Sequence, residues 1–192
     1  MRIVGGKYKG RIFSPNKRFS SRPTTDMAKE ALFNILSNRY EFSALNILDL
    51  FSGTGSIGYE FISRGAETVT FVELHSAHTQ FIREVTEKLD INNIRIIRND
   101  VFRFLKSCSV QFDIIFADPP FDLPGIGEIP AAVLDSGVLH PDGLFILEHS
   151  KSFSFSHNPY FKEMRMYGKV HFSFFSFQTN NSTTPLNPTD GD

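Results

Sequence analysis

The feature that most constrains the fold is a regular alternation of short apolar runs with segments of helical spacing. Five runs are nearly continuous in apolar residues, namely 44–51, 68–72, 94–98, 112–117 and 143–148. Such runs are typical of strands whose two faces are both covered. Between most of them, apolar residues recur every three or four positions, which predicts helices. Strands that alternate with helices favour a mostly parallel α/β sheet.

The two ends of the chain differ from this core. Residues 2–13 alternate loosely around glycines, which predicts a short hairpin with basic side chains on its exposed face. The stretches 162–167 and 170–177 flank Gly168 and predict an antiparallel hairpin that closes the sheet. We therefore expect a basic N-terminal arm over 1–24, an α/β domain over 25–177 and a disordered tail over 178–192.

Charge is distributed unevenly along the chain. The net charge is −1, yet residues 1–22 hold seven basic side chains and no acidic one, which leaves 13 basic against 21 acidic residues in the rest. A basic arm on an acidic body indicates a polyanionic partner, although a solvated basic tail has the same composition.

Other composition features exclude several classes of protein. The single cysteine, Cys108, excludes an internal disulfide framework and a cysteine zinc site. His75 and His78 have no further ligand residues at metal-binding spacing, so we expect them on a surface face. The apolar stretches are too short for a transmembrane helix, and the N-terminus lacks a signal-peptide core. We expect a cytoplasmic protein.

A glycine-rich loop follows the first buried strand. Residues 48–58 contain G-x-G-x-x-G, with Gly53, Gly55 and Gly58, between a predicted strand and a predicted helix. Glycines in this position let the backbone turn tightly and approach a bound nucleoside. NAD, FAD and S-adenosylmethionine binders share this loop, and a tight turn without a ligand is the alternative.

Carboxylates follow the next two strands. Glu73 lies twenty residues after Gly53 and can accept both hydroxyls of a ribose. Asp100 ends the third strand, where it can accept a hydrogen bond from an adenine amine or cap the following helix. The alternative for Glu73 is an exposed carboxylate at the start of a helix.

The most discriminating motif is Asp118-Pro119-Pro120-Phe121, directly after the fourth strand. The exocyclic amine of a nucleobase is planar, and it must become more tetrahedral to attack a methyl group. Two acceptors on its N–H groups favour that change, and here they are the Asp118 carboxylate and the Pro119 carbonyl. The prolines fix the turn, and Phe121 can stack on a flipped base.

These motifs together resemble the RsmD family of class I methyltransferases, which methylate N2 of a guanine in small-subunit (16S) ribosomal RNA. The resemblance covers about residues 1–177. It is carried by 1–11, 22–26, 29–36, 49–55, 63–66 and 118–121. It implies a Rossmann-like fold with a seven-stranded sheet, helices on both faces, the C-terminal hairpin and a small N-terminal hairpin arm. It also implies direct methyl transfer from S-adenosylmethionine without a metal.

The resemblance assigns roles residue by residue. The target base would meet Asp118, Pro119, Pro120 and Phe121. The cofactor would meet Arg22, Pro23, Thr24, Asp49, Gly53, Gly55, Glu73, Asp100 and Val101. Ribosomal RNA would meet Arg2, Lys7, Lys9, Arg11, Lys17 and Arg18. The expected partner is small-subunit rRNA or an assembly particle, and the expected state is a monomer.

Alternative functions share some of these motifs. Adenine-N6 methylation of DNA or RNA, or glutamine methylation of a protein, would use the same turn. The basic N-terminus favours rRNA instead. A NAD-dependent oxidoreductase would need a histidine or a tyrosine–lysine pair for hydride transfer, and no such constellation is present. An RNA-binding module that has lost catalysis would not need the intact Asp118 and Glu73.

Overall fold

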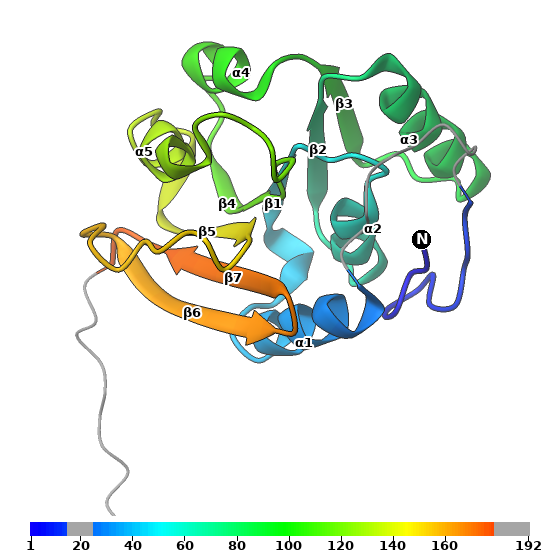
Figure 1. The fold of residues 1–192 in the computed structure, drawn as a ribbon. Helices are drawn as coiled ribbons and strands as arrows, with labels where there is room; N and C mark the ends of the chain where they lie inside the picture. Colours follow the sequence, from blue (N-terminus) through cyan, green and yellow to red (C-terminus); the bar gives the residue numbers. More distant parts are fainter. Residues whose placement is uncertain (15–24, 179–192) are drawn as a thin grey trace, which may run out of the picture.

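Seven strands form one mixed sheet in the order β3-β2-β1-β4-β5-β7-β6 (Figure 1). The computed structural model describes residues 1–14 and 25–178. The strands are β1 Asn46–Leu50, β2 Thr68–Glu73, β3 Ile94–Arg98, β4 Phe112–Ala117, β5 Leu139–His149, β6 Phe161–Tyr167 and β7 Val170–Phe175. The first five are parallel to one another, and β7 pairs antiparallel with both β5 and β6. The expected sheet and its C-terminal hairpin are confirmed.

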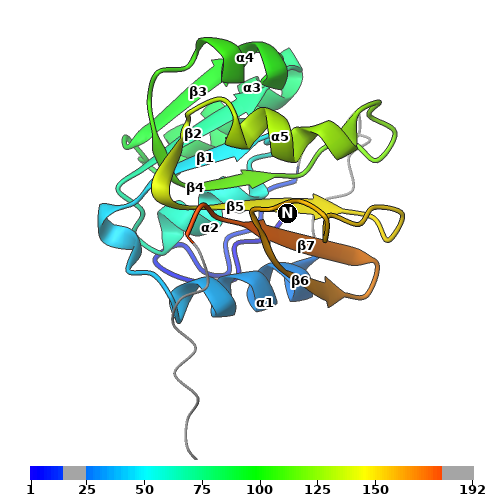
Figure 2. The same ribbon diagram turned by 90° about the vertical axis from the view of Figure 1, so that its left-hand side faces the viewer.

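Helices cover both faces of the sheet (Figure 2). The helices are α1 Asp26–Ser37, α2 Ser56–Ser63, α3 Ser76–Lys88, α4 Val101–Ser107 and α5 Ile129–Leu134, with 3-10 turns η1 Phe42–Ala44 and η2 Ile126–Glu128. One core packs α1, α2 and α3 on the sheet, and the other packs α4 and α5 on the opposite face.

The continuous apolar runs are explained by these two cores. Successive side chains of a strand point to opposite faces, so a strand covered on both sides must be apolar at every position. In β2, Phe71 belongs to one core and its neighbour Val72 to the other. In β7, Phe174 and Phe175 divide in the same way, which confirms that these phenylalanines are core residues.

Local signals set most element ends. Thr25 caps α1 by accepting the Ala28 N–H at 3.2 Å. The strand expected from residue 143 begins earlier, at Leu139. The β4–β5 register shifts between Phe112 and Ile114, and this irregularity accommodates the polar and proline residues 140–143. Because those residues break the apolar run, the sequence does not show that the strand continues through them.

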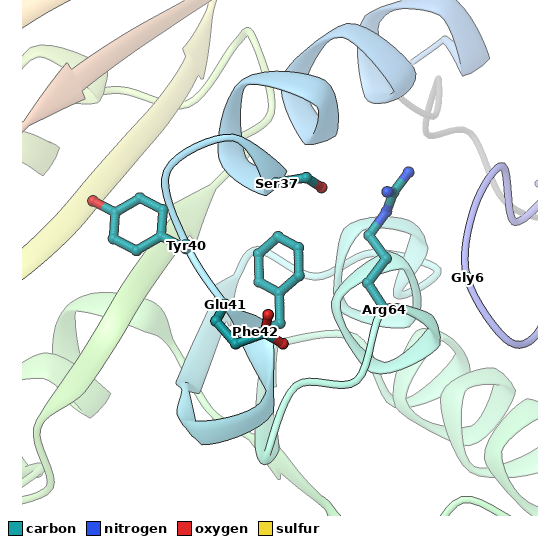
Figure 3. A pocket seen from close by; sticks show the side chains of 6 residues that line it. All are labelled: Gly6, Ser37, Tyr40, Glu41, Phe42 and Arg64. Atoms are coloured by element: carbon teal, nitrogen blue, oxygen red, sulfur yellow. The ribbon is translucent and has the colours of Figure 1, made fainter.

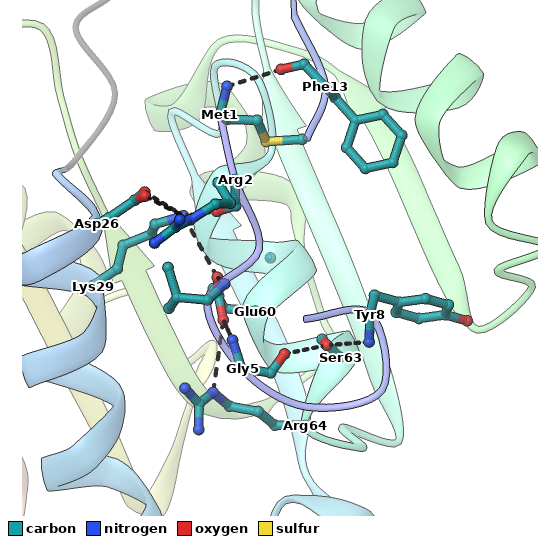
Figure 4. Close-up of polar contacts among 12 residues, drawn as sticks. Met1, Arg2, Gly5, Tyr8, Phe13, Asp26, Lys29, Glu60, Ser63 and Arg64 are labelled. Carbon is teal, nitrogen blue, oxygen red and sulfur yellow. Dashed lines mark hydrogen bonds and ion pairs between the residues drawn. The ribbon is translucent and has the colours of Figure 1, made fainter. Parts of the chain in front are cut away.

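The N-terminal segment, residues 1–14, forms a loop closed by a single antiparallel bridge between Arg2 and Ile12, rather than a hairpin of two full strands. The loop lies against α2 (Figure 4). The Lys7 N–H reaches the carbonyl of Ser63 at 2.6 Å, and a Cβ on Gly6 would collide with the same carbonyl. This close approach, together with the positive φ of 71° at Gly6, requires glycine there.

A buried charge cluster fixes this segment to the helices. The Glu60 carboxylate is fully buried on α2 and accepts the N–H groups of Val4 at 2.5 Å and Gly5 at 3.2 Å (Figure 4). Lys29 of α1, also buried, lies 3.5 Å from Glu60 and donates to the Arg2 carbonyl. The Met1 ammonium donates to the Phe13 carbonyl at 2.8 Å. The segment is therefore held by polar groups of α1 and α2.

Among the helices of residues 1–14 and 25–178, none combines the length and the apolar character that crossing a membrane requires.

Candidate active site

The strand order fixes where a ligand can bind. From β1 the chain moves outward through β2 and β3, and then returns to the other side of β1 with β4 and β5. In open parallel sheets, ligands bind outside the carboxyl ends of the strands at such a switch point. The glycine loop follows β1 and the Asp118 turn follows β4, so the two motifs flank this point. The Asp118 N–H faces the Leu50 carbonyl at 3.4 Å, which places both loops side by side.

The glycine loop has an unusual backbone. Phe51, Gly53 and Gly55 all have positive φ, of 55°, 53° and 78°. For Phe51 this conformation is strained, and such strain is typical of functional loops. The Ser52 hydroxyl donates to the Asp49 carbonyl at 2.6 Å and so helps to hold the turn. The Ser56 hydroxyl, at the start of α2, is buried and has no hydrogen-bond partner among the described residues.

Glu73 lies at the carboxyl end of β2 and points into this loop. Its Oε2 accepts the Gly53 N–H and its Oε1 accepts the His75 N–H, both at 2.8 Å. Burial would raise the pKa of Glu73, but hydrogen bonding to His78, His75 and Gly53 outweighs it and lowers that pKa. Glu73 is therefore an ionised carboxylate held against the glycine loop.

Asp100 and Val101 lie at the end of β3. The Asp100 Oδ1 accepts the Arg103 N–H at 3.0 Å and caps α4, whose first residue is Val101. The Asn99 N–H reaches the Glu73 carbonyl at 3.2 Å, which brings this strand end beside that of β2. Asp100 is half-buried, so capping leaves its second oxygen available for a ligand.

The Asp118 turn presents an aromatic ring to solvent. Pro119 is buried, Pro120 is exposed, and the Phe121 side chain is 59% exposed. The Leu123 N–H donates to the Pro120 carbonyl at 2.9 Å and closes the turn. A large exposed phenylalanine beside a carboxylate provides a stacking surface next to a hydrogen-bond acceptor.

Several carboxylates share this end of the sheet. Burial, with the nearby Glu148 and Asp49, raises the pKa of Asp118 well above its ordinary value. Burial also raises the pKa of Asp49 to about 8, against the hydrogen bond from the Gly58 N–H at 3.0 Å and with the help of Glu73. Glu148 lies at the end of β5, one residue beyond the Ala117–Leu147 pair. This concentration of acidic groups suits a cationic ligand.

The predicted RNA-contact residues that lie within the described segment 1–14 are positioned away from the glycine loop. The backbone of Lys7 and Tyr8 contacts Ser63, the last residue of α2, whose first turn follows the glycine loop. A helix of this length spans about 12 Å. Lys7, Lys9 and Arg11 are exposed, whereas Arg2 is paired with Asp26 at 3.0 Å.

The structure brings together Asp49, Gly53, Gly55, Glu73, Asp100, Val101 and the Asp118–Phe121 turn at one edge of the sheet. Five predicted residues lie outside the described residues, namely Lys17, Arg18, Arg22, Pro23 and Thr24, and so does the tail after residue 178. His78 and Glu148 were not predicted as site residues. The rule that functional residues gather at strand ends identifies Glu148 from sequence, but no sequence signal identifies the contact of His78 with Glu73.

A separate cavity of about 330 Å³ lies at the far end of α2 (Figure 3). It is lined by Gly6, Ser37, Tyr40, Glu41, Phe42 and Arg64. The Arg64 guanidinium stacks over the Phe33 ring at 4.9 Å, and Arg64 also lies near Glu60. These contacts place Arg64 in the packing between α1 and α2, so the cavity is distinct from the carboxylate-lined crevice.

Comparison with known proteins shows the family of the chain. The family model described as "Conserved hypothetical protein 95" matches residues 1–176. Ribosomal RNA small subunit methyltransferase D of Buchnera aphidicola subsp. Baizongia pistaciae is 31% identical over 179 residues, which is 91% of each chain. The enzyme of the same name from Escherichia coli K12 is 32% identical over 148 residues, covering 77% of this chain and 74% of its own. The chain belongs to the RsmD family.

Solved structures agree with the RsmD assignment. The putative methyltransferase yhhF from Escherichia coli superposes with a TM-score of 0.81 at 27% identity, over 93% of this chain and 99% of its own. SMU.776, a putative methyltransferase complexed with SAH, shares the fold at a TM-score of 0.62 and 16% identity, over 77% of this chain and 49% of its own. The Rossmann-like methyltransferase fold is confirmed, and with it the expected class of enzyme, a methyltransferase that uses S-adenosylmethionine. The oxidoreductase alternative is set aside.

Proposed function

We propose that this chain transfers a methyl group from S-adenosylmethionine to the exocyclic N2 amine of a guanine in small-subunit ribosomal RNA. The observation that carries the proposal is the position of the Asp118-Pro119-Pro120-Phe121 turn. It lies at the carboxyl end of β4, directly beside the glycine loop. An acceptor carboxylate, an acceptor carbonyl and an exposed ring therefore meet at the switch point of the sheet.

The residues present fit the cofactor. Each Glu73 oxygen accepts one backbone N–H, and an ionised carboxylate offers about four acceptor positions. Since His78 also contacts Oε1, the open position on Oε2 remains for the ribose. The buried Ser56 hydroxyl, without a partner among the described residues, is a polar group for the ligand in the glycine loop. Asp100 and the Val101 backbone would hold the adenine, and Asp49 would support the loop from beneath by accepting the Gly58 N–H.

When bound, the cofactor supplies a sulfonium methyl group that is already a strong electrophile. The protein then has to position the amine and polarise it. Asp118 and the Pro119 carbonyl would accept the two N–H hydrogens, which makes the nitrogen more tetrahedral and stabilises its developing positive charge. The amine would gain the methyl group that the cofactor supplies and would lose one proton to Asp118 or to water. Phe121 would stack on the flipped base and fix its plane.

The proposed substrate is supported by the names of the relatives and by the positive charge of the N-terminal segment. Relatives that align with most of this chain are named ribosomal RNA small subunit methyltransferase D, which supports an rRNA methyltransferase. Lys7, Lys9 and Arg11 are exposed on the N-terminal segment and would contact phosphates, with Lys17 and Arg18 beyond the described part. Arg22, Pro23 and Thr24 would cover the methionine end of the cofactor. Recognition of an assembly particle and a monomeric state stay predictions.

The test is the product formed by the purified full-length chain. We expect N2-methylguanosine after incubation with S-adenosylmethionine and small ribosomal subunits, or their naked rRNA, from cells that lack this methylation. Nucleosides are identified by mass spectrometry after complete digestion. N6-methyladenosine in place of the guanosine product would redirect the proposal to the adenine alternative, and no methylated nucleoside would contradict both.

A further inference from the structure

His78 is the polar side chain of α3 that contacts the candidate ribose-binding carboxylate. Its Nδ1 lies 3.4 Å from the Glu73 Oε1, and its side chain is only 15% exposed. The contact joins two different elements, because Glu73 ends β2 whereas His78 lies in the first turn of α3. The imidazole is an additional contact on a carboxylate that already accepts two backbone N–H groups.

The three contacts fix the carboxylate from different directions. The Gly53 N–H comes from the glycine loop, the His75 N–H from the start of α3, and His78 from within that helix. The two backbone donors hold one oxygen each, which still allows the carboxylate plane to tilt between them. A third contact on Oε1 restricts that tilt. The acceptor position that remains on Oε2 then keeps one orientation before a ligand arrives.

We propose that His78 is a positioning residue for the cofactor, whose imidazole holds Glu73 in the orientation that accepts the ribose hydroxyls. This inference rests on the proposed function, because it takes the ligand to be a nucleoside with two free ribose hydroxyls. His78 acts only through Glu73 and does not touch the methyl group or the target base.

The electrostatics of the crevice support this role. Burial disfavours a charged Glu73, and the charge of Glu73 in turn helps to raise the pKa of Asp49. Hydrogen bonding to His78 lowers the pKa of Glu73 against its burial, together with the two backbone N–H groups. An ionised carboxylate is a stronger acceptor for hydroxyl groups than a protonated one.

The test compares substitutions that separate donation from packing. In His78→Asn, the side-chain amide nitrogen can occupy the place of Nδ1 and still donate. In His78→Leu, similar apolar volume remains without a donor. Gln80→Leu is the matched control, because Gln80 is exposed on the same helix and its side chain contacts Glu84 rather than Glu73.

Binding of S-adenosylhomocysteine to the full-length chain is measured by calorimetry. We expect His78→Leu to weaken binding about tenfold, as for the loss of one hydrogen bond to a charged group. His78→Asn should stay within about threefold of wild type, and Gln80→Leu should match wild type. In methylation assays, His78→Leu should raise KM for S-adenosylmethionine and leave kcat and KM for RNA unchanged.

Other outcomes overturn the inference. Wild-type affinity in His78→Leu would show that the imidazole does not hold Glu73, and equal losses in the leucine and asparagine variants would show that packing, not donation, matters. If the leucine variant does not fold, His78→Ala against His78→Asn makes the same comparison. Failure of the wild-type chain to bind S-adenosylhomocysteine would instead overturn the proposed function, so the two failures are distinguishable.

Discussion

Individual carboxylates in the crevice differ in what surrounds them, and this difference gives each a separate role. Glu73 receives several donors and has a lowered pKa, whereas Asp118 and Asp49 are buried near other acids and have raised pKa values. A carboxylate kept ionised suits the binding of hydroxyl groups. A carboxylate with a raised pKa lies closer to the protonation change that accompanies loss of a proton from an amine.

Asp118 should control turnover rather than cofactor binding. Asp118→Ala removes an acceptor for the amine and is expected to lower kcat by roughly 10²-fold, with KM for S-adenosylmethionine unchanged. Asp118→Asn keeps one acceptor oxygen, so its kcat should fall less than that of Asp118→Ala. Because the pKa of Asp118 is raised, its acceptor form increases with pH, so wild-type kcat should rise with pH and the asparagine variant should show a flatter profile. Initial rates across the pH range check both points, and an alanine variant with wild-type kcat would contradict the mechanism.

Asp49 should make stability depend on pH. Its pKa is about 8 in the folded chain against an ordinary 3.8, so the folded state keeps a proton that the unfolded state releases. The stabilisation is complete below the ordinary pKa and is lost as pH rises through the folded value, with a slope of up to about 1.4 kcal/mol per pH unit. Asp49→Asn should lack this slope. Urea unfolding of both proteins between these pH values provides the measurement, and parallel pH profiles would show that Asp49 is not the source.

At the scale of elements, the position of the glycine loop depends on how closely α2 packs on β2. Gly58 is the third glycine of the loop motif and lies in the first turns of α2. A Cβ at this position would lie 2.1 Å from the Phe71 ring, closer than any real contact. The glycine therefore allows the helix to approach the strand that carries Glu73, and it links the packing of the core to the geometry of the site.

Gly58→Ala should destabilise the fold. The added methyl group must displace Phe71, and overpacking of this kind costs about 1–3 kcal/mol. For a chain of this size, the expected fall in Tm is about 5 °C. Gly127→Ala is the control, because nothing lies within 4 Å of the Cβ that it adds. Thermal unfolding of the two variants measures the effect. An unchanged Tm in Gly58→Ala would mean that α2 can shift without loss of stability.

On the scale of the whole molecule, the basic and acidic regions occupy different places. The exposed Lys7 and Lys9 lie on the segment that packs on the far end of α2, while the carboxylates line the crevice at its beginning. An RNA that contacts both would follow the length of α2, with phosphates on the basic segment and one base in the crevice. The Glu60 and Lys29 cluster holds the segment in that position.

Neutralising the basic segment should weaken RNA binding in a salt-dependent manner. Replacing Lys7, Lys9 and Arg11 by glutamine is expected to reduce the slope of log affinity against log salt by about 2, since each lost phosphate contact removes about 0.7–0.9. The control removes three exposed charges elsewhere, at Arg95, Lys106 and Lys169. Filter binding at several salt concentrations measures both variants. Equal slopes for the two triple variants would show that the segment does not meet phosphates.

Local sequence signals were enough to predict the strands, most helix ends and the strand-end motifs. Apolar periodicity reports burial, and turn residues report backbone geometry, so both are encoded locally. Predictions were less accurate where polar residues interrupt a strand, as at the start of β5, and where pairing is limited to one bridge, as in the N-terminal segment.

Contacts between side chains of different elements follow from the folded structure alone. The contact of His78 with Glu73, the hydrogen bond of Gly58 to Asp49 and the docking of the N-terminal segment on Glu60 join residues from different elements. Their geometry depends on how helices pack across the sheet. A periodic pattern fixes the face on which a residue lies, but it carries no information about which side chain from another element lies opposite, because that is set by packing of the complete core.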